Sequence, residues 1–123
     1  MNRPQGKEIE RSDFMKTHEK KLYIKRLESG HLVTNVPRQV ISHSPGGFEI
    51  GYNGCGPADF ALNALLMVTT RKQLAWRYYQ DFKRQWVAQL PHEGGSIDIT
   101  TVRRWLYRRI RITRQTKYEG ELV

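Results

Sequence analysis

A glycine-rich turn near the middle of the chain separates two stretches with different hydrophobic periodicity. Before it, Leu22 and Ile24 alternate with polar residues, and Ser29-Gly30 separates them from a second apolar stretch at 32–36, which predicts a β-hairpin. After it, apolar residues recur every three or four positions from Pro57 to Val68, which predicts a helix. The change of period predicts an α+β fold, with a small antiparallel β-sheet in the N-terminal half followed by two to three α-helices.

Turn and capping residues predict the other elements. Residues 39–42 and 48–52 flank a Ser-Pro-Gly-Gly turn, so we expect them to be extended and to add to the sheet. A second helix is predicted from Lys72 to Leu90, because Pro91 then stops it. After a short extended stretch at 96–99, Thr100 or Thr101 can cap a third helix.

The length and charge distribution predict one folded unit with charged ends. A chain of 123 residues has the size of a single domain. Residues 1–17 show no regular periodicity and are predicted to form a flexible N-terminal arm, residues 18–106 a single α+β domain, and residues 107–123 a basic C-terminal extension. The net charge of +9 makes an anionic partner the first hypothesis to consider.

The C-terminal cations are mostly arginines, which bind phosphate bidentately and stack on bases. We predict that they form an anion-binding or nucleic-acid-binding set, made up of Arg103, Arg104, Arg108, Arg109, Arg111, Arg114 and Lys117. On a helix, Val102, Leu106 and Ile110 would face the core, and Arg104, Arg108 and Arg111 would lie on an exposed flank. Trp105 and Tyr107 lie between the arginines, which is compatible with base stacking. The alternative is a solvated basic tail that only aids solubility.

Cysteine and histidine usage excludes several site types. A single cysteine, Cys55, rules out an intramolecular disulfide and a zinc site built on several thiolates. The four histidines are scattered, so we predict no metal and no cofactor. No apolar run has the roughly 20 residues needed to cross a bilayer, which favours a cytoplasmic protein without a membrane partner.

The central turn carries a motif, Ser44-Pro45-Gly46-Gly47-Phe48-Glu49-Ile50-Gly51-Tyr52-Asn53-Gly54-Cys55-Gly56-Pro57-Ala58. This motif resembles the signature SPxGFEWGYxGSGPAxLALxIL of small uncharacterised domains of unknown function from phages and bacterial mobile elements. The resemblance covers roughly 23–106, with Ile50 and Cys55 standing where the family usually has Trp and Ser. It implies a small strand-then-helix domain of mobile-element origin, and it implies no reaction.

Two interpretations of this turn are open. In the first, its residues only connect a strand to a buried helix. In the second, the free N–H groups from Gly56 to Asp59 form an anion-binding nest at the start of the helix. The residues concerned are Gly51, Tyr52, Gly54, Gly56, Pro57 and Asp59.

Cys55 supports a second class of function. Over four residues, Cys-Gly-Pro-Ala resembles the catalytic segment of papain-like bacteriocin-processing peptidases, and a helix N-terminus stabilises a thiolate. A cysteine hydrolase would then use Cys55 with His92, the only histidine downstream. The competing interpretation is that Cys55 is a small buried residue in place of serine.

These observations favour a non-enzymatic accessory protein of a phage or mobile element that binds an anionic target. The target would be nucleic acid, a nucleotide signal or an acidic surface of a host protein, and in the last two cases the protein would inhibit a host defence system. The alternatives are a small cysteine hydrolase using Cys55 and a structural or assembly protein.

Overall fold

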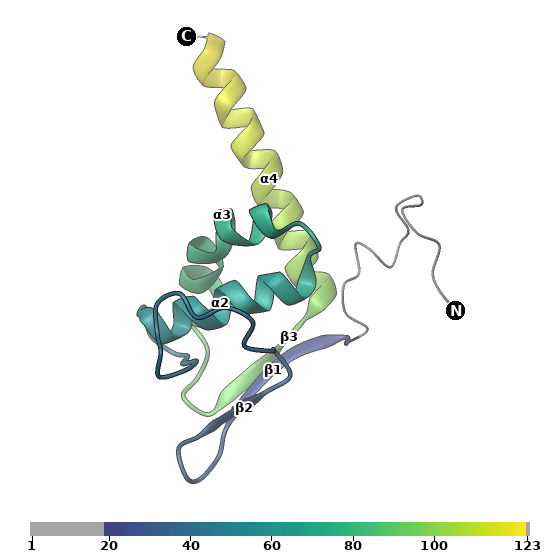
Figure 1. Cartoon of the computed structure of the whole chain (residues 1–123). Helices are drawn as coiled ribbons and strands as arrows, with labels where there is room; N and C mark the ends of the chain where they lie inside the picture. Colours follow the sequence, from purple (N-terminus) through teal and green to yellow (C-terminus); the bar gives the residue numbers. More distant parts are fainter. Residues whose placement is uncertain (1–18, 123) are drawn as a thin grey trace, which may run out of the picture.

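The structure, a computed structural model, describes residues 19–122, with side chains as far as residue 113, so the predicted N-terminal arm lies outside the described residues. The elements follow in the order β1 (Lys21–Arg26), β2 (Leu32–Thr34), α2 (Cys55–Val68), α3 (Lys72–Phe82), the π-helical turn η1 (Lys83–Val87), β3 (Gly94–Asp98) and α4 (Ile99–Leu122) (Figure 1). The predicted α+β fold with a small antiparallel sheet is therefore confirmed.

The sheet has the order β2-β1-β3, and both pairs of strands are antiparallel. Leu22 and Ile24 of β1 are buried, whereas their neighbours along the strand point to the exposed face, as the alternating pattern predicted. The third strand comes from residues 94–98, after two helices, and not from the first half of the chain. Gly94 permits this pairing, because a Cβ built on it would lie 2.0 Å from the carbonyl oxygen of Ile24.

The prediction that residues 39–42 and 48–52 are strands is wrong. Side chains of α2 bind the backbone of the first segment in place of a neighbouring strand. Asn63 Oδ1 accepts hydrogen bonds from the N–H groups of Gln39 and Val40, at 2.7 and 2.9 Å, and Asn63 Nδ2 donates to the carbonyl oxygen of Val40. These hydrogen bonds to side chains satisfy the backbone groups that would otherwise need a neighbouring strand.

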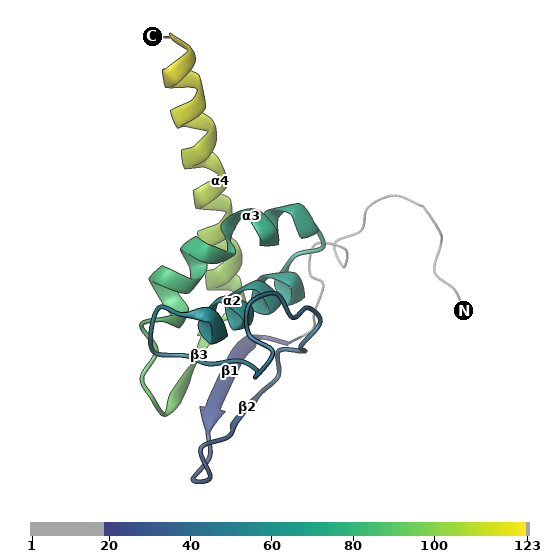
Figure 2. The same ribbon diagram turned by 60° about the vertical axis from the view of Figure 1, so that its left-hand side comes forward.

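The helices form the bulk of the core. α2 is buried from Gly56 to Val68, and in Figures 1 and 2 the sheet lies on one side of it and α3 on the other. The second predicted helix is split into α3 and η1, which ends at Val87 rather than Leu90. α4 begins at Ile99, one residue before the first predicted cap, and its C-terminal part extends beyond the other elements in both views.

Candidate functional site

The glycine-rich turn is closely packed. Gly56, Pro57 and Asp59 are all buried, and a Cβ added to Gly56 would lie 2.6 Å from the Cβ of Glu49. Gly51 adopts a φ of +86°, and its N–H donates to the carbonyl oxygen of Val87 at 3.1 Å. Loop atoms therefore cover the start of α2, which favours the interpretation of this motif as a connection.

The other turn residues have local contacts too. The exposed ring of Tyr52 lies against Gly54, where an added Cβ would meet a ring carbon at 2.3 Å. The carboxylate of Asp59 accepts hydrogen bonds from three backbone N–H groups, those of Ser42, His43 and Ser44. Asp59 therefore holds the Ser-Pro-Gly-Gly loop onto α2.

Arg26 connects three loops next to this turn. Its guanidinium donates to the carbonyl oxygens of His92 and Gly30, at 3.0 and 3.2 Å, and to Glu49 Oε1 at 3.0 Å. The hydrogen bond from Arg26 lowers the pKa of Glu49 from its ordinary value of 4.5 against the opposing effect of burial, and His92 adds a smaller attraction. Because this carboxylate is already paired, Arg26 and Glu49 hold the surrounding loops together.

Cys55 is exposed, so the interpretation of Cys55 as a buried residue is wrong. The reason is its position, since it is the first residue of α2 and the buried stretch begins one residue later. His92 is also exposed. Among the hydrogen bonds of residues 19–113, none joins Cys55 to a histidine.

One face of α4 docks onto α3 and η1 through long side chains. Trp105 Nε1 donates to Gln85 Oε1 at 2.8 Å, and the indole packs edge-on against Phe82. One turn further, Arg109 forms an ion pair with Asp81 at 2.9 Å. Trp105 is therefore part of the core, which contradicts the expectation that it could stack on a base, and one of the predicted anion-binding arginines is engaged within the protein.

The other faces of α4 agree with the predicted periodicity. Val102 and Leu106 are buried and Ile110 packs against the core, whereas Arg104, Arg108 and Arg111 are exposed. Arg114 and Lys117 belong to α4, but their side chains lie outside the described part.

A hollow of about 440 Å³ lies where the end of α2, the start of α3 and the first half of α4 meet, and we call it the arginine groove. Its apolar lining consists of Val68, Leu74, Leu106 and Ile110. Its polar lining consists of Thr69, Tyr107 and three arginines, Arg71, Arg103 and Arg111. No acidic residue lines it, so the groove combines an apolar surface with concentrated positive charge.

Arg103 is the least satisfied of these arginines. Its Nε and Nη2 atoms are buried and have no hydrogen-bond partner among the residues that the structure describes. Burial lowers the pKa of Arg103 from its ordinary value, but an arginine stays charged at neutral pH. A buried charged donor without an acceptor is costly, so Arg103 is the side chain in the groove best prepared to receive an anion.

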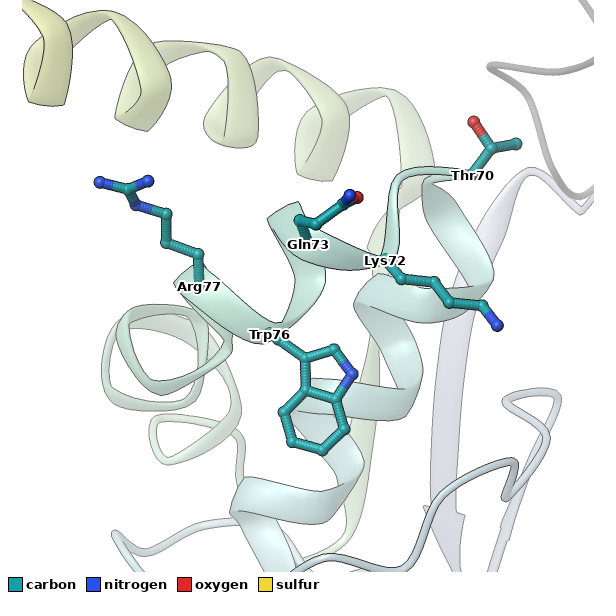
Figure 3. Close-up of a pocket in the computed structure, with 5 residues that line it drawn as sticks. All are labelled: Thr70, Lys72, Gln73, Trp76 and Arg77. Carbon is teal, nitrogen blue, oxygen red and sulfur yellow. The ribbon is translucent and has the colours of Figure 1, made fainter.

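A second hollow, of about 750 Å³, lies on the outer surface of α3. Thr70, Lys72, Gln73, Trp76 and Arg77 line it, all from one helix and the turn before it. Figure 3 shows that Lys72 and Trp76 extend to one side of α3 and that Gln73 and Arg77 extend to the other. Side chains that diverge in this way form an open basic surface instead of an enclosed site.

Sequence reasoning missed the cations at the start of α3. Arg71 and Lys72 lie at the N-terminal end of this helix, where the positive end of the helix dipole disfavours cations, and its first turn contains no acid. Such a violation of a local rule is a signal for function. The sequence could not connect these two cations with α4, because only the folded chain brings Arg71 and Arg103 to one groove.

Other site types find no support in the described part. Residues 19–113 contain no group of three His, Cys, Asp or Glu side chains placed to hold a metal ion. Across the described helices, none combines the length and the apolar composition that a bilayer span requires.

Comparison with known proteins gives a family without an assigned activity. Neither a search of curated proteins nor a search of solved structures finds a match. The model of one sequence family covers residues 11–108, which includes β1, the glycine-rich turn and the first half of α4. The chain therefore belongs to a family of unknown function, DUF6166.

Proposed function

We propose that this protein is a non-enzymatic accessory protein that binds nucleic acid through the basic surface formed by α3 and α4. The observation that carries this proposal is the way the charges are distributed over these helices. In the stretches 71–87 and 99–113, Asp81 is the only acidic residue, and it is already paired with Arg84 and Arg109. The remaining cations have no acidic partner among the described residues, namely Arg71, Lys72, Arg77, Lys83, Arg103, Arg104, Arg108 and Arg111.

The physical reason is the charge density of the target. Double-stranded DNA carries about one negative charge per 1.7 Å of helix axis, and cations that replace its counterions gain free energy from counterion release. Arg104 and Arg108 are one helical turn apart on the exposed flank of α4, so both can contact one phosphate backbone. Contacts of this kind bind without reading the sequence.

Two aromatic side chains extend the proposal to single strands. Tyr107 is 66% exposed and Trp76 is 45% exposed, and each lies beside cations of the basic surface. Exposed aromatic rings among cations are the usual arrangement for stacking unpaired bases. We therefore expect single-stranded nucleic acid to bind at least as tightly as duplex.

The resemblance to phage and mobile-element domains suggests the biological setting. A small basic protein from such an element would act as an accessory factor on nucleic acid, or as an inhibitor that binds a nucleotide signal or an acidic surface of a host defence protein. The charge distribution favours nucleic acid, because α4 presents cations along an extended helix, and an extended polyanion matches that shape.

The test is a pair of charge reversals of equal size on two different surfaces. In the first variant, Arg104→Glu and Arg108→Glu change α4. In the control, Lys21→Glu and Lys25→Glu change the exposed face of β1 by the same charge. We expect the α4 variant to weaken binding of labelled oligo(dT) by at least about tenfold, and the control by less than about threefold.

Three other outcomes have clear meanings. Equal loss in both variants would show that net charge alone drives binding, and no loss in the α4 variant would show that its arginines are a solvated surface. Either result would refute the proposed binding surface. If Cys55→Ser abolishes a hydrolytic activity, the cysteine hydrolase would replace this proposal.

A further inference from the structure

We propose that the arginine groove is a binding site for one nucleotide unit, with the phosphate at Arg103 and the base against the apolar lining. This inference rests on the proposed function but makes a separate claim, because Arg104 and Arg108, which carry the test of that function, are not part of the groove lining. The nucleotide unit that binds there would be either a free nucleotide or one nucleotide within a nucleic-acid strand. The two sources share the same chemistry, a phosphate attached to a flat base.

The first step is the geometry of Arg103. Its two unpartnered atoms, Nε and Nη2, form one edge of the guanidinium, and their N–H bonds point in nearly the same direction. A phosphate or carboxylate can bind such an edge with two oxygens at once. The missing partner of Arg103 is thus an acceptor with two oxygens, and none of the described side chains supplies it.

The second step is the charge around Arg103. Arg71 approaches the groove from the start of α3, and Arg111 lies two turns further along α4. Asp81, the one acidic residue within 71–87 and 99–113, is already bound to Arg84 and Arg109 and does not line the groove. The groove therefore offers a phosphate three lining arginines and no lining carboxylate.

The third step is the apolar lining. The groove also has an apolar surface formed by Leu74, Leu106 and Ile110. Because a phosphate alone would not contact this surface favourably, the groove is suited to a ligand with an apolar or aromatic part beside its anionic group. Tyr107 stands at the edge with most of its ring exposed, where it can pack against a base. The volume of about 440 Å³ is in the usual range of small-ligand sites.

Binding requires a small rearrangement in the groove. The Nε and Nη2 atoms of Arg103 are covered in the ligand-free protein, so the Arg103 side chain or its neighbours must shift to admit a phosphate. Surface side chains change rotamer on a time scale of picoseconds to nanoseconds. The ligand then supplies the acceptor that Nε and Nη2 of Arg103 lack.

The test uses two adjacent arginines on the full-length chain. Arg103→Lys keeps the charge but removes the two-donor edge, and Arg104→Lys makes the same change on the exposed flank. Affinity is measured by calorimetry for AMP, GMP, CMP and UMP, with inorganic phosphate and uridine as partial ligands, and for an oligo(dT) of about 16 nucleotides. Thermal unfolding of both variants verifies that they are folded.

We expect at least one mononucleotide to bind the wild type more tightly than either phosphate or uridine alone. Arg103→Lys should weaken it by about ten- to a hundredfold, whereas Arg104→Lys should change it by less than about threefold. If the mononucleotide competes with oligo(dT), the groove binds a nucleotide within a strand. If a mononucleotide binds and oligo(dT) does not, the ligand of the groove is a free nucleotide. This result would support the groove proposal and refute the proposed function.

Two results would overturn the groove proposal. The first is that none of the four mononucleotides binds the wild type at millimolar concentration, whatever the oligo(dT) result. The second is that Arg103→Lys and Arg104→Lys have equal effects on mononucleotide binding. If oligo(dT) still binds in either case, the proposed function stands and the groove is only a hollow in the basic surface. A misfolded Arg103→Lys protein would be replaced by Arg111→Lys, which also changes a lining residue and should weaken mononucleotide binding more than Arg104→Lys does.

Discussion

At the scale of single residues, two polar side chains on α2 determine how the central loop is held. Asp59 and Asn63 are one helical turn apart, both are fully buried, and both bind backbone groups of residues 39–44. The sequence placed Asp59 near the start of a helix, where an acid suits the helix dipole. The structure gives it a different role, because a carboxylate with two free oxygens is the acceptor that three loop N–H groups need.

Replacement of Asp59 tests this role. We expect Asp59→Asn to lower the free energy of unfolding by about 2–3 kcal/mol, because the amide group replaces an acceptor oxygen with donors that face other donors. Urea denaturation followed by circular dichroism measures the change. Asp98→Asn, at an exposed position of β3, is the control and should change stability by less than about 0.5 kcal/mol. Equal stability of the two variants would contradict the assigned role of Asp59.

At the scale of elements, α4 is the helix that both completes the core and presents the basic residues. Periodicity correctly predicted that Val102 and Leu106 face inward and that Arg104 and Arg108 face outward. The same spacing places Trp105 beside Val102 and Leu106, but its partners Phe82 and Gln85, which receive its ring and its N–H, come from a different part of the chain and could not be identified from periodicity. The stretch at 96–99 was predicted to be extended, but its pairing was not predicted, since the residues of β3 pair with residues of β1 that lie 69 to 77 positions earlier in the chain.

Two aromatic substitutions on α4 distinguish its docked face from its open face. Trp105→Ala should lower the free energy of unfolding by about 3–5 kcal/mol, because it leaves a cavity against Phe82. Tyr107→Ala should change stability by less than about 0.5 kcal/mol, since most of that ring is exposed. Chemical denaturation of both variants gives the comparison. A similar loss in both would show that α4 does not dock through Trp105.

At the scale of the whole molecule, folding converts a nearly neutral central sequence into a polarised surface. Between 29 and 102 the cations and acids almost balance, so the sequence predicts that the binding charge lies mainly at the chain ends. In the structure Glu49, Asp59 and Asp81 are used internally, so the cations of α3 join those of α4. The exposed acid Glu28 lies in the turn between β1 and β2, and the exposed Glu93 is next to it, because its carbonyl oxygen accepts a hydrogen bond from the N–H of Arg26 at the end of β1. Figure 1 shows this hairpin turn at the opposite end of the molecule from the C-terminal part of α4.

The salt dependence of nucleic-acid binding tests the central claim most directly. The affinity for oligo(dT) is measured by fluorescence anisotropy at several salt concentrations, and the logarithm of the association constant is plotted against the logarithm of the salt concentration. Each phosphate contact on a single strand contributes a slope of about −0.7, so about three contacts from the basic surface predict a slope near −2. The Arg104→Glu, Arg108→Glu variant should have a slope shallower by about 1.4, for two lost contacts. A wild-type slope near zero, or equal slopes for the two proteins, would contradict the claim that α3 and α4 bind nucleic acid.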